Sequence, residues 1–250
     1  MRICVISDAH IKFVPWDAAD RENAKLFQAF LKKSVGKYDL LVLNGDIFDL
    51  WFDWKSLIIK EYFGVLHRFA ELDETGCKIV MISGNHDFWF NDFFTKHLNA
   101  VVQDKSHALT ADGKKMFFSH GDFYTYNDTR YKILRRLIRL PFSKGLFSLL
   151  HPELALRLGA KLSRSSRFRQ VPALLQRKKS EGLEHHAGYM IKRKGYDIVC
   201  MGHSHHPKIQ RLDGGIYANS GDWTTHRSYL EIIDGEVELK FYNEKGDQPC

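Results

Sequence analysis

The alternation of apolar and polar positions divides the chain into strand-like and helix-like runs. Runs rich in apolar residues, four to six residues long and typical of buried strands, occur at residues 2–7, 39–43, 78–82, 116–119 and 197–201. Between the first three runs, apolar residues recur at the three- and four-residue spacing of amphipathic helices over residues 21–33 and 56–75. This alternation predicts parallel strands joined by helical crossovers.

The second half of the chain is predicted to be richer in strands. After a short helix at residues 91–98, Asp112-Gly113 lies between two alternating runs as a hairpin turn. Another helix is expected at residues 181–194. Four further strand-like runs, separated by Asp-Gly turns, should close a second, antiparallel-rich sheet: residues 209–212, 215–218, 229–233 and 236–242. We therefore expect an α/β fold in which two sheets form a sandwich flanked by helices.

Length and charge indicate one domain with an inserted cap. A chain of 250 residues can build one well-buried α/β core, so we expect a single domain over residues 1–250. The net charge of +7 is unevenly spread: residues 130–179 hold fourteen Lys or Arg and one acid, Glu153, while the other 200 residues sum to −6. Leucines recur there at helical spacing and prolines interrupt them, which predicts two or three short amphipathic helices. Residues 123–180 are therefore predicted to form a helical lid, here called the insertion.

The sequence predicts a cytoplasmic protein. No apolar run approaches the roughly 20 residues of a membrane span, and Met1 leads directly into a strand without a signal-peptide pattern. Cys4, Cys77 and Cys200 lie in or beside predicted core strands, and Cys250 is the last residue. None belongs to a CxxC pair, so we expect free thiols in a reducing compartment.

Five short polar segments, each directly after one of the five strand-like runs, carry the candidate chemistry. They are residues 8–10 (DAH), 45–46 (GD), 84–87 (GNHD), 120–122 (HGD) and 202–205 (GHSH). Side chains placed just past strand ends converge on one edge of a sheet. Carboxylate, imidazole and amide donors without a thiolate suit Mn²⁺, Fe²⁺ or Zn²⁺. The ordered set therefore predicts a binuclear metal site that acts on phosphate esters.

The spacing within the first segment suggests how one ion would be held. Asp8 and His10 are two residues apart, so on an extended strand both would face the same side and bind the same ion. Two ions roughly 3.5 to 4 Å apart can hold a hydroxide at neutral pH and clamp the phosphate oxygens. The hydroxide would then attack phosphorus in line with the leaving oxygen.

The order of these segments resembles that of the calcineurin-like metallophosphoesterases, and the resemblance extends from Asp8 to His205. It implies the two-sheet metallophosphoesterase sandwich and two divalent ions, with manganese expected and iron or zinc as alternatives. The resemblance assigns to the first ion Asp8, His10, Asp46 and His205. It assigns to the second ion Asp46, Asn85, His120 and His203, so Asp46 would bridge.

The same resemblance suggests roles for residues beside the ligands. His86 matches a family histidine that binds no metal and lies near the leaving group, where it would donate a proton or stabilise charge, with Asp87 orienting its ring. Asp49 and Asp122 are candidates to accept the distal N–H of a metal-bound imidazole, or else are cap and turn residues. Substrate contacts are implied for Asn85, His86, Asp128 and His203.

One branch of the family is more similar than the others. Residues 45–51 (GDIFDLW), 84–88 (GNHDF), 120–128 and the basic insertion resemble the UDP-2,3-diacylglucosamine pyrophosphatases of lipid A synthesis. Those enzymes cleave the pyrophosphate of UDP-2,3-diacylglucosamine and release UMP and 2,3-diacylglucosamine 1-phosphate. Many of them carry Arg where this chain has His86, so the chain resembles their histidine-bearing subgroup. This departure leaves other phosphodiester substrates open.

The insertion suits a lipid nucleotide. Two acyl chains need an apolar groove, the pyrophosphate needs cations, and an anionic leaflet attracts Lys and Arg, so Arg135, Arg136 and Arg139 are expected to face a membrane. The protein would then be peripheral on the inner membrane. The alternative is a solvated cap that only covers the site. All seven predicted ligands lie outside the insertion, so the metal centre is expected to be independent of it.

Two other functions compete with this one. A nuclease or cyclic-nucleotide phosphodiesterase of the same superfamily could use the basic insertion to follow a nucleic-acid backbone. The insertion is poor in the Trp and Tyr that stack bases, which argues against nucleic acid without excluding it. A non-enzymatic scaffold is a remote alternative, because every expected ligand position is filled. No obligate protein partner is inferred.

Overall fold

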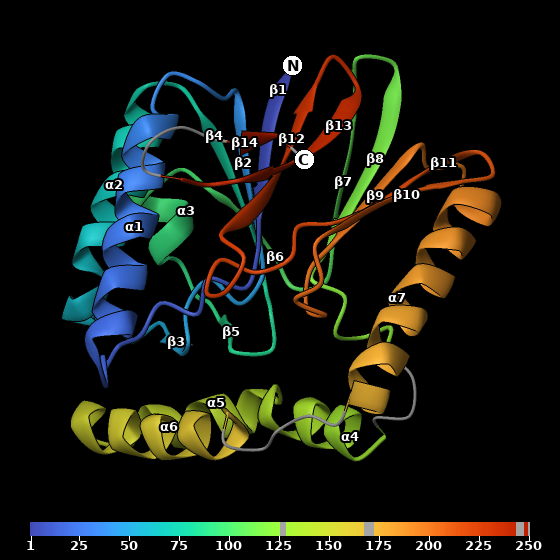
Figure 1. Ribbon diagram of the computed structural model, residues 1–250. Helices are drawn as coiled ribbons and strands as arrows, with labels where there is room; N and C mark the ends of the chain where they lie inside the picture. Colours follow the sequence, from blue (N-terminus) through green and yellow to red (C-terminus); the bar gives the residue numbers. More distant parts are fainter. Residues whose placement is uncertain (126–128, 168–172, 244–247, 250) are drawn as a thin grey trace.

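Two β-sheets pack face to face in the computed structural model, with helices on both outer faces (Figure 1). The structure describes residues 1–125, 129–167, 173–243 and 248–249. The helices are α1 (Ala18–Ser34), α2 (Phe63–Glu74), α3 (Phe93–His97), α4 (Thr129–Ile138), α5 (Pro141–Ser148), α6 (Pro152–Arg167) and α7 (Ala173–Lys194), with a 3₁₀ turn, η1 (Lys60–Tyr62). The predicted α/β sandwich is thus confirmed.

The larger sheet has seven strands in the order β14-β13-β12-β1-β2-β4-β6. Its strands are β1 (Arg2–Ile6), β2 (Leu40–Asn44), β4 (Lys78–Ile82), β6 (Val101–Gln103), β12 (Ser228–Ile233), β13 (Glu236–Phe241) and β14 (Gln248–Pro249). β1, β2, β4 and β6 are parallel, as the alternating pattern predicts. The crossover helix α2 begins later than predicted, because the chain before it is irregular from residue 53 and then forms η1.

The smaller sheet has five strands in the order β10-β11-β9-β8-β7. Its strands are β7 (His107–Ala111), β8 (Lys114–Ser119), β9 (Ile198–Met201), β10 (Lys208–Leu212) and β11 (Gly215–Asn219). β8, β9 and β11 are parallel to one another, and β7 and β10 are antiparallel edge strands. A separate pair of short strands, β3 (Trp51–Phe52) and β5 (Asp87–Trp89), lies below the sheets.

The last hairpin corrects one prediction. The four runs after residue 208 were expected to close one sheet, but β12 and β13 instead join the seven-stranded sheet beside β1. The reason is that β12 is buried on both faces. Leu230 and Ile232 pack between the sheets, whereas Tyr229 packs against Phe30 of α1. Only a strand covered by a sheet on one side and a helix on the other can bury both sets.

Three apolar layers hold the sandwich together. The layer between the sheets includes Val5, Val42 and Phe118, and α1 and α2 cover the outer face of the larger sheet. α7 covers the smaller sheet through Leu183 and Ile191, among others. Cys4, Cys77 and Cys200 are buried free thiols, as expected. In the part of the chain that is described, no helix is long and apolar enough to cross a membrane.

The helices α4, α5 and α6, here called the cap helices, lie across the lower ends of both sheets (Figure 1). They agree with the two or three short helices predicted within the insertion. That end of the sheets is where the parallel strands finish, so the cap helices lie over the loops that carry the polar segments.

Replacing Phe30 with Ala should lower the free energy of unfolding by about 3 to 5 kcal/mol. Phe30 is 2% exposed and its ring packs against Trp223, Tyr229 and Tyr242, so a cavity would remain. Chemical denaturation measures the loss. Phe63→Ala is the matched control, because Phe63 is 66% exposed, and it should change stability by less than about 1 kcal/mol. Equal losses in the two variants would contradict this assignment of the core.

Candidate metal centre

Six loops converge where the parallel strands of both sheets end. Strands β1, β2 and β4 contribute from the larger sheet, and β8, β9 and β11 contribute from the smaller one. Backbone hydrogen bonds tie the loops together: Asp8 N–H donates to the Gly45 carbonyl at 3.0 Å, and Gly202 N–H donates to the His120 carbonyl at 3.1 Å. All seven predicted ligands lie in these loops, although the sequence segments are up to about 200 residues apart.

The ligand residues adopt an unusual backbone conformation. Five of the seven have positive φ: Asp8 (53°), His10 (44°), Asp46 (55°), His203 (64°) and His205 (55°). Positive φ is uncommon outside glycine, and such strain gathers at functional sites. The expectation that Asp8 and His10 share a face of an extended strand is therefore wrong. β1 ends at Ile6, and left-handed turns after it bring the two side chains together.

Two motif glycines are needed for close approach between the loops. A Cβ on Gly84 would lie 2.1 Å from Oδ1 of Asp46. A Cβ on Gly202 would lie 2.4 Å from Oγ of Ser7 and 2.6 Å from Oδ2 of Asp8. Because the obstructing atoms are buried and hydrogen bonded, neither position can hold a larger residue without moving a candidate ligand.

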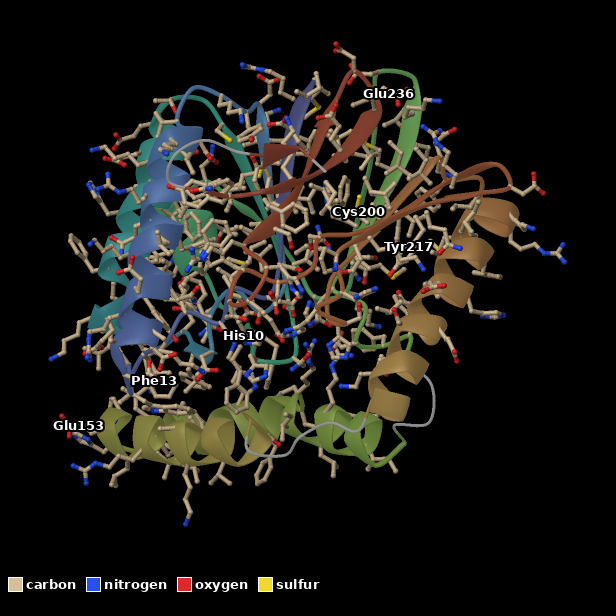
Figure 2. The ribbon with its side chains drawn as sticks, viewed as in Figure 1. His10, Phe13, Glu153, Cys200, Tyr217 and Glu236 are labelled. Atoms are coloured by element: carbon tan, nitrogen blue, oxygen red, sulfur yellow. The ribbon has the colours of Figure 1, made fainter. Side chains whose placement is uncertain are left out.

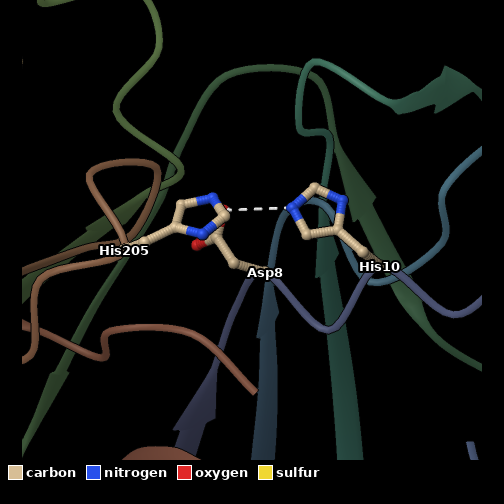
Figure 3. A group of neighbouring side chains, drawn as sticks. All are labelled: Asp8, His10 and His205. Carbon is tan, nitrogen blue, oxygen red and sulfur yellow. Dashed lines mark ion pairs between the residues drawn. The ribbon is translucent and has the colours of Figure 1, made fainter. Parts of the chain in front are cut away.

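The first group of candidate ligands is Asp8, His10 and His205. Asp8 Oδ1 lies 3.2 Å from Nε2 of His205 and 3.9 Å from Nε2 of His10. Figure 3 shows the two rings approaching the Asp8 carboxylate from different segments of the chain. Asp8 is fully buried, and its Oδ1 has no hydrogen-bond partner in the described structure. A buried carboxylate oxygen that accepts no hydrogen bond and faces two imidazole nitrogens fits a metal ligand, because a buried charge needs a compensating cation.

The second group is Asp46, Asn85, His120 and His203. Nε2 of His120 lies 3.4 Å from Oδ2 of Asp46 and 3.1 Å from Oδ1 of Asn85. The rings of His120 and His203 are 5.1 Å apart, and Asp46 Oδ2 is also 3.9 Å from Nε2 of His10. Asp46 therefore lies between the two groups, as a bridging carboxylate would. Nε2 of His203 is buried without a hydrogen-bond partner among the described residues, which fits a metal ligand.

Charge at the site is dominated by the two buried carboxylates. Burial lowers the pKa of His203 well below its usual value, so its ring is neutral, as metal binding requires. Burial opposes protonation of His120 as well, but Asp46 and Asp8 outweigh it and raise the pKa of His120 to about 10. Burial would raise the pKa of Asp46, yet the surrounding imidazoles, His120 first, hold it well below the usual range. The Asp46 carboxylate is thus charged and attracts cations.

Asp222 is a supporting residue that the sequence reasoning missed. Its Oδ2 lies 3.0 Å from Nδ1 of His205, which fixes the ring and leaves Nε2 directed at Asp8. Asp222 follows β11 in a Gly-Asp pair, the same signal that marked Asp46 after β2. For His120 this support comes from the Asn44 carbonyl, 3.1 Å from Nδ1.

Asp87 does not orient His86. Its carboxylate instead accepts four backbone N–H groups, from Asp46, Ile47, Phe48 and Gly84, at 2.8 to 3.1 Å. Nδ1 of His86 lies 3.1 Å from the Asp49 carbonyl oxygen and 3.8 Å from Oδ1 of the same residue. The expected role therefore falls to Asp49, and Asp87 joins the Gly84 loop to the Asp46 loop. Asp49 also pairs with Lys12, and both are buried.

Asp122 does not support a metal-bound imidazole either. Its Oδ2 lies 2.8 Å from Nε of Arg135 of α4, and both side chains are buried. The side chain of Arg139 is only 14% exposed, and it donates to the carbonyl of Gly84 in another ligand loop. The expectation that Arg135 and Arg139 face a membrane is therefore wrong; Arg136, between them, is exposed. Asp128 lies outside the described residues.

Comparisons with known proteins agree with this geometry. A family model described as calcineurin-like phosphoesterase matches residues 1–207. A UDP-2,3-diacylglucosamine hydrolase of Porphyromonas gingivalis is 31% identical over 173 residues, covering 66% of this chain and 63% of that protein. The hydrolase of the same name from Ralstonia nicotianae is 24% identical over 246 residues, covering 92% and 88%.

A solved structure agrees at the level of the fold. Vacuolar Protein Sorting 29 from Cryptosporidium parvum aligns over 100% of this chain and 95% of its own, with a TM-score of 0.51 and 12% identity. The likeness shows the fold alone. Together with the family match, it confirms the metallophosphoesterase sandwich. The family match and the curated relatives show a hydrolase of phosphate esters, for which the family implies divalent metal ions.

Replacing Asp222 with Asn should weaken Mn²⁺ binding by about 10- to 100-fold, because the His205 ring loses the carboxylate that orients it. Titration of the purified protein with Mn²⁺ measures this. Asp197→Asn is the matched control: Asp197 accepts from Lys115 N at the opposite end of the smaller sheet and should leave Mn²⁺ affinity unchanged. Unchanged affinity in Asp222→Asn would remove Asp222 from the site.

Proposed function

Because the chain belongs to the calcineurin-like phosphoesterase family, we propose that it hydrolyses the pyrophosphate of UDP-2,3-diacylglucosamine to UMP and 2,3-diacylglucosamine 1-phosphate. The curated relatives named for that substrate support the proposal. The observation that carries it is an apolar groove between α6 and the chain segments 13–16 and 54–61, the first of which begins three residues after the candidate ligand His10.

Two divalent ions, manganese by preference, would be held by the two groups of ligands. Asp8, His10 and His205 would hold one ion, Asn85, His120 and His203 the other, and Asp46 both. When bound, such ions polarise the phosphate and lower the pKa of a water molecule at the site. Asp8 Oδ1 and His203 Nε2 support this assignment, because within the described residues both are buried and neither makes a hydrogen bond.

His86 would serve the leaving group. A carbonyl oxygen can only accept a hydrogen bond, so Nδ1 of His86 carries the proton that it shares with Asp49 O. Nε2 is then the atom that can exchange a proton with the departing oxygen. The ring lies 4.8 Å from that of His10, edge to face, so it is adjacent to the first group of ligands.

The groove beside the site suits an acyl chain. Its volume is about 730 Å³, and Phe13, three residues after His10, forms part of its wall. In Figure 2, Phe13 lies beside the start of α6, where Glu153 is labelled. The other apolar lining residues are Val14, Trp16, Trp54, Leu57, Ile58, Ile59, Pro152, Leu156 and Ala160. The lining also includes charged residues, namely Lys60, Glu61, Glu153, Arg157 and Lys161.

The outer surface of the cap helices supports attachment to a membrane. Large apolar side chains are exposed along all three helices and the turns between them: Ile133, Leu137, Leu140, Phe142, Leu146, Leu149, Leu150, Leu154 and Leu158. Apolar patches of this kind mark interaction surfaces. A cytoplasmic enzyme that draws a diacylated substrate from the inner membrane would use them to rest on the bilayer.

A substrate panel tests the function. With Mn²⁺, the purified protein should hydrolyse UDP-2,3-diacylglucosamine at least tenfold more efficiently than a cyclic dinucleotide or single-stranded DNA. Ile58→Asp, in the groove, should lower kcat/KM for the diacylated substrate at least tenfold and leave a small soluble diester unaffected. Phe63→Asp is the control, since Phe63 is exposed outside the groove. A preference for DNA that falls steeply with salt would favour the nuclease instead.

Membrane attachment has its own test. Phe142→Ser and Leu149→Ser remove side chains that are 78% and 83% exposed, and each should weaken binding to phosphatidylglycerol vesicles by roughly tenfold, because apolar contact with the bilayer is lost. Phe63→Ser removes an exposed side chain of α2, outside the cap helices, and should leave vesicle binding unchanged. If wild-type protein ignored these vesicles at low salt, the attachment proposal would fail and the hydrolase proposal would stand.

A further inference from the structure

The cap helices are bonded directly to the loop that carries Asn85 and His86. Nη2 of Arg139, at the end of α4, donates to the Gly84 carbonyl at 2.6 Å. Further along the same loop, Trp89 Nε1 donates to the Ile138 carbonyl at 3.2 Å. Lys144 of α5 donates to the Phe90 carbonyl at 3.0 Å. Three contacts thus join α4 and α5 to residues 84–90.

A second buried arginine holds α4 to the other ligand loop. Arg135 lies one turn before Arg139, and its Nε is 2.8 Å from the carboxylate of Asp122, two residues after His120. The Arg135 guanidinium also lies 3.2 Å from the Phe123 ring centroid. Arg135 and Asp122 are 4% and 1% exposed, so separating them would strand a buried charge.

Apolar contacts reinforce the same interface. The Phe147 ring of α5 lies 4.8 Å from those of Phe52 and Trp89, which belong to the paired strands β3 and β5. The cap helices α4 and α5 therefore pack directly against the polar loops. The expectation that the metal centre is independent of the insertion conflicts with these contacts.

We propose that Arg139 is a positioning residue for phosphoester hydrolysis. By bonding to the Gly84 carbonyl it fixes the peptide group that precedes Asn85, and so the docked α4 adds to the bonds from Asp87, Asp46 and Asp49 that hold this loop in place. Arg135 keeps α4 docked through Asp122. This inference rests on the metal centre of the proposed function and not on the lipid substrate.

Two substitutions separate this role from a general effect on α4. Arg139→Met removes the donors and keeps the length of the side chain. Arg136→Met, three residues before Arg139, removes an exposed charge from the same helix. Asp104→Asn removes the exposed carboxylate that Arg139 also contacts at 2.5 Å, and leaves the Gly84 bond intact.

The measurements are the kcat and KM for bis(p-nitrophenyl) phosphate with saturating Mn²⁺, and a Mn²⁺ binding isotherm. In Arg139→Met, kcat should fall at least tenfold, KM should change less than threefold, and the affinity for one Mn²⁺ should fall about tenfold through Asn85. Arg136→Met and Asp104→Asn should stay within threefold of wild type in all three. Methylguanidinium should restore part of the kcat of Arg139→Ala, since it can occupy the vacated position.

Several results would overturn the inference. Wild-type kcat and Mn²⁺ affinity in folded Arg139→Met would do so, as would equal losses in Arg139→Met and Arg136→Met. If Arg139→Met unfolds, Arg139→Lys keeps one donor, and its kcat must still fall below that of Arg136→Met. A wild-type protein that neither bound Mn²⁺ nor cleaved the diester would instead refute the proposed metal centre, and this inference with it.

Discussion

Two buried carboxylates, Asp8 and Asp46, govern the arrangement of the site. They are 0% and 2% exposed at the junction of the two sheets, and a buried carboxylate is tolerated only with compensating donors or cations. The loops supply some of these: Asp8 Oδ2 accepts from Ser7 Oγ and from His203 N–H, and Asp46 Oδ1 accepts from His86 N–H. The other two oxygens, Asp8 Oδ1 and Asp46 Oδ2, face imidazole nitrogens. Divalent ions held between them would neutralise the buried charge.

The sequence predicted what depends on local pattern and on order. Strand period marked β1, β2, β4, β8 and β9, and the polar residues after each strand marked the ligands, because the ends of parallel strands meet whatever their separation in sequence. The sheet that receives β12 was not predictable from its own residues, since its partners are β1 and α1 at the other end of the chain. Asp222 was missed because its Gly-Asp pair follows a strand that had been assigned to a hairpin.

The direction of side chains on the cap helices was the least predictable feature. Composition alone gave a basic, leucine-rich segment, and a helix carrying Arg135, Arg136 and Arg139 offers no local sign of which arginine is buried. The distinction comes from acceptors elsewhere in the chain. Asp122 and the Gly84 carbonyl select Arg135 and Arg139, which are four residues apart and so lie on one face of α4.

This division of the basic residues changes how the cap can meet a bilayer. Arg135, Arg139 and Lys144 are engaged with the ligand loops, so their charges are not offered to lipid headgroups. Each cation near an anionic surface contributes only about 1 kcal/mol to membrane binding. The cap helices present fewer cations to solvent than their composition suggests. In the proposed attachment, exposed leucines and Phe142 would then supply most of the binding free energy. The helices α4 and α5, which would rest on lipid, are hydrogen bonded to the loop of Asn85 and His86. A displacement of these helices would therefore also displace that loop.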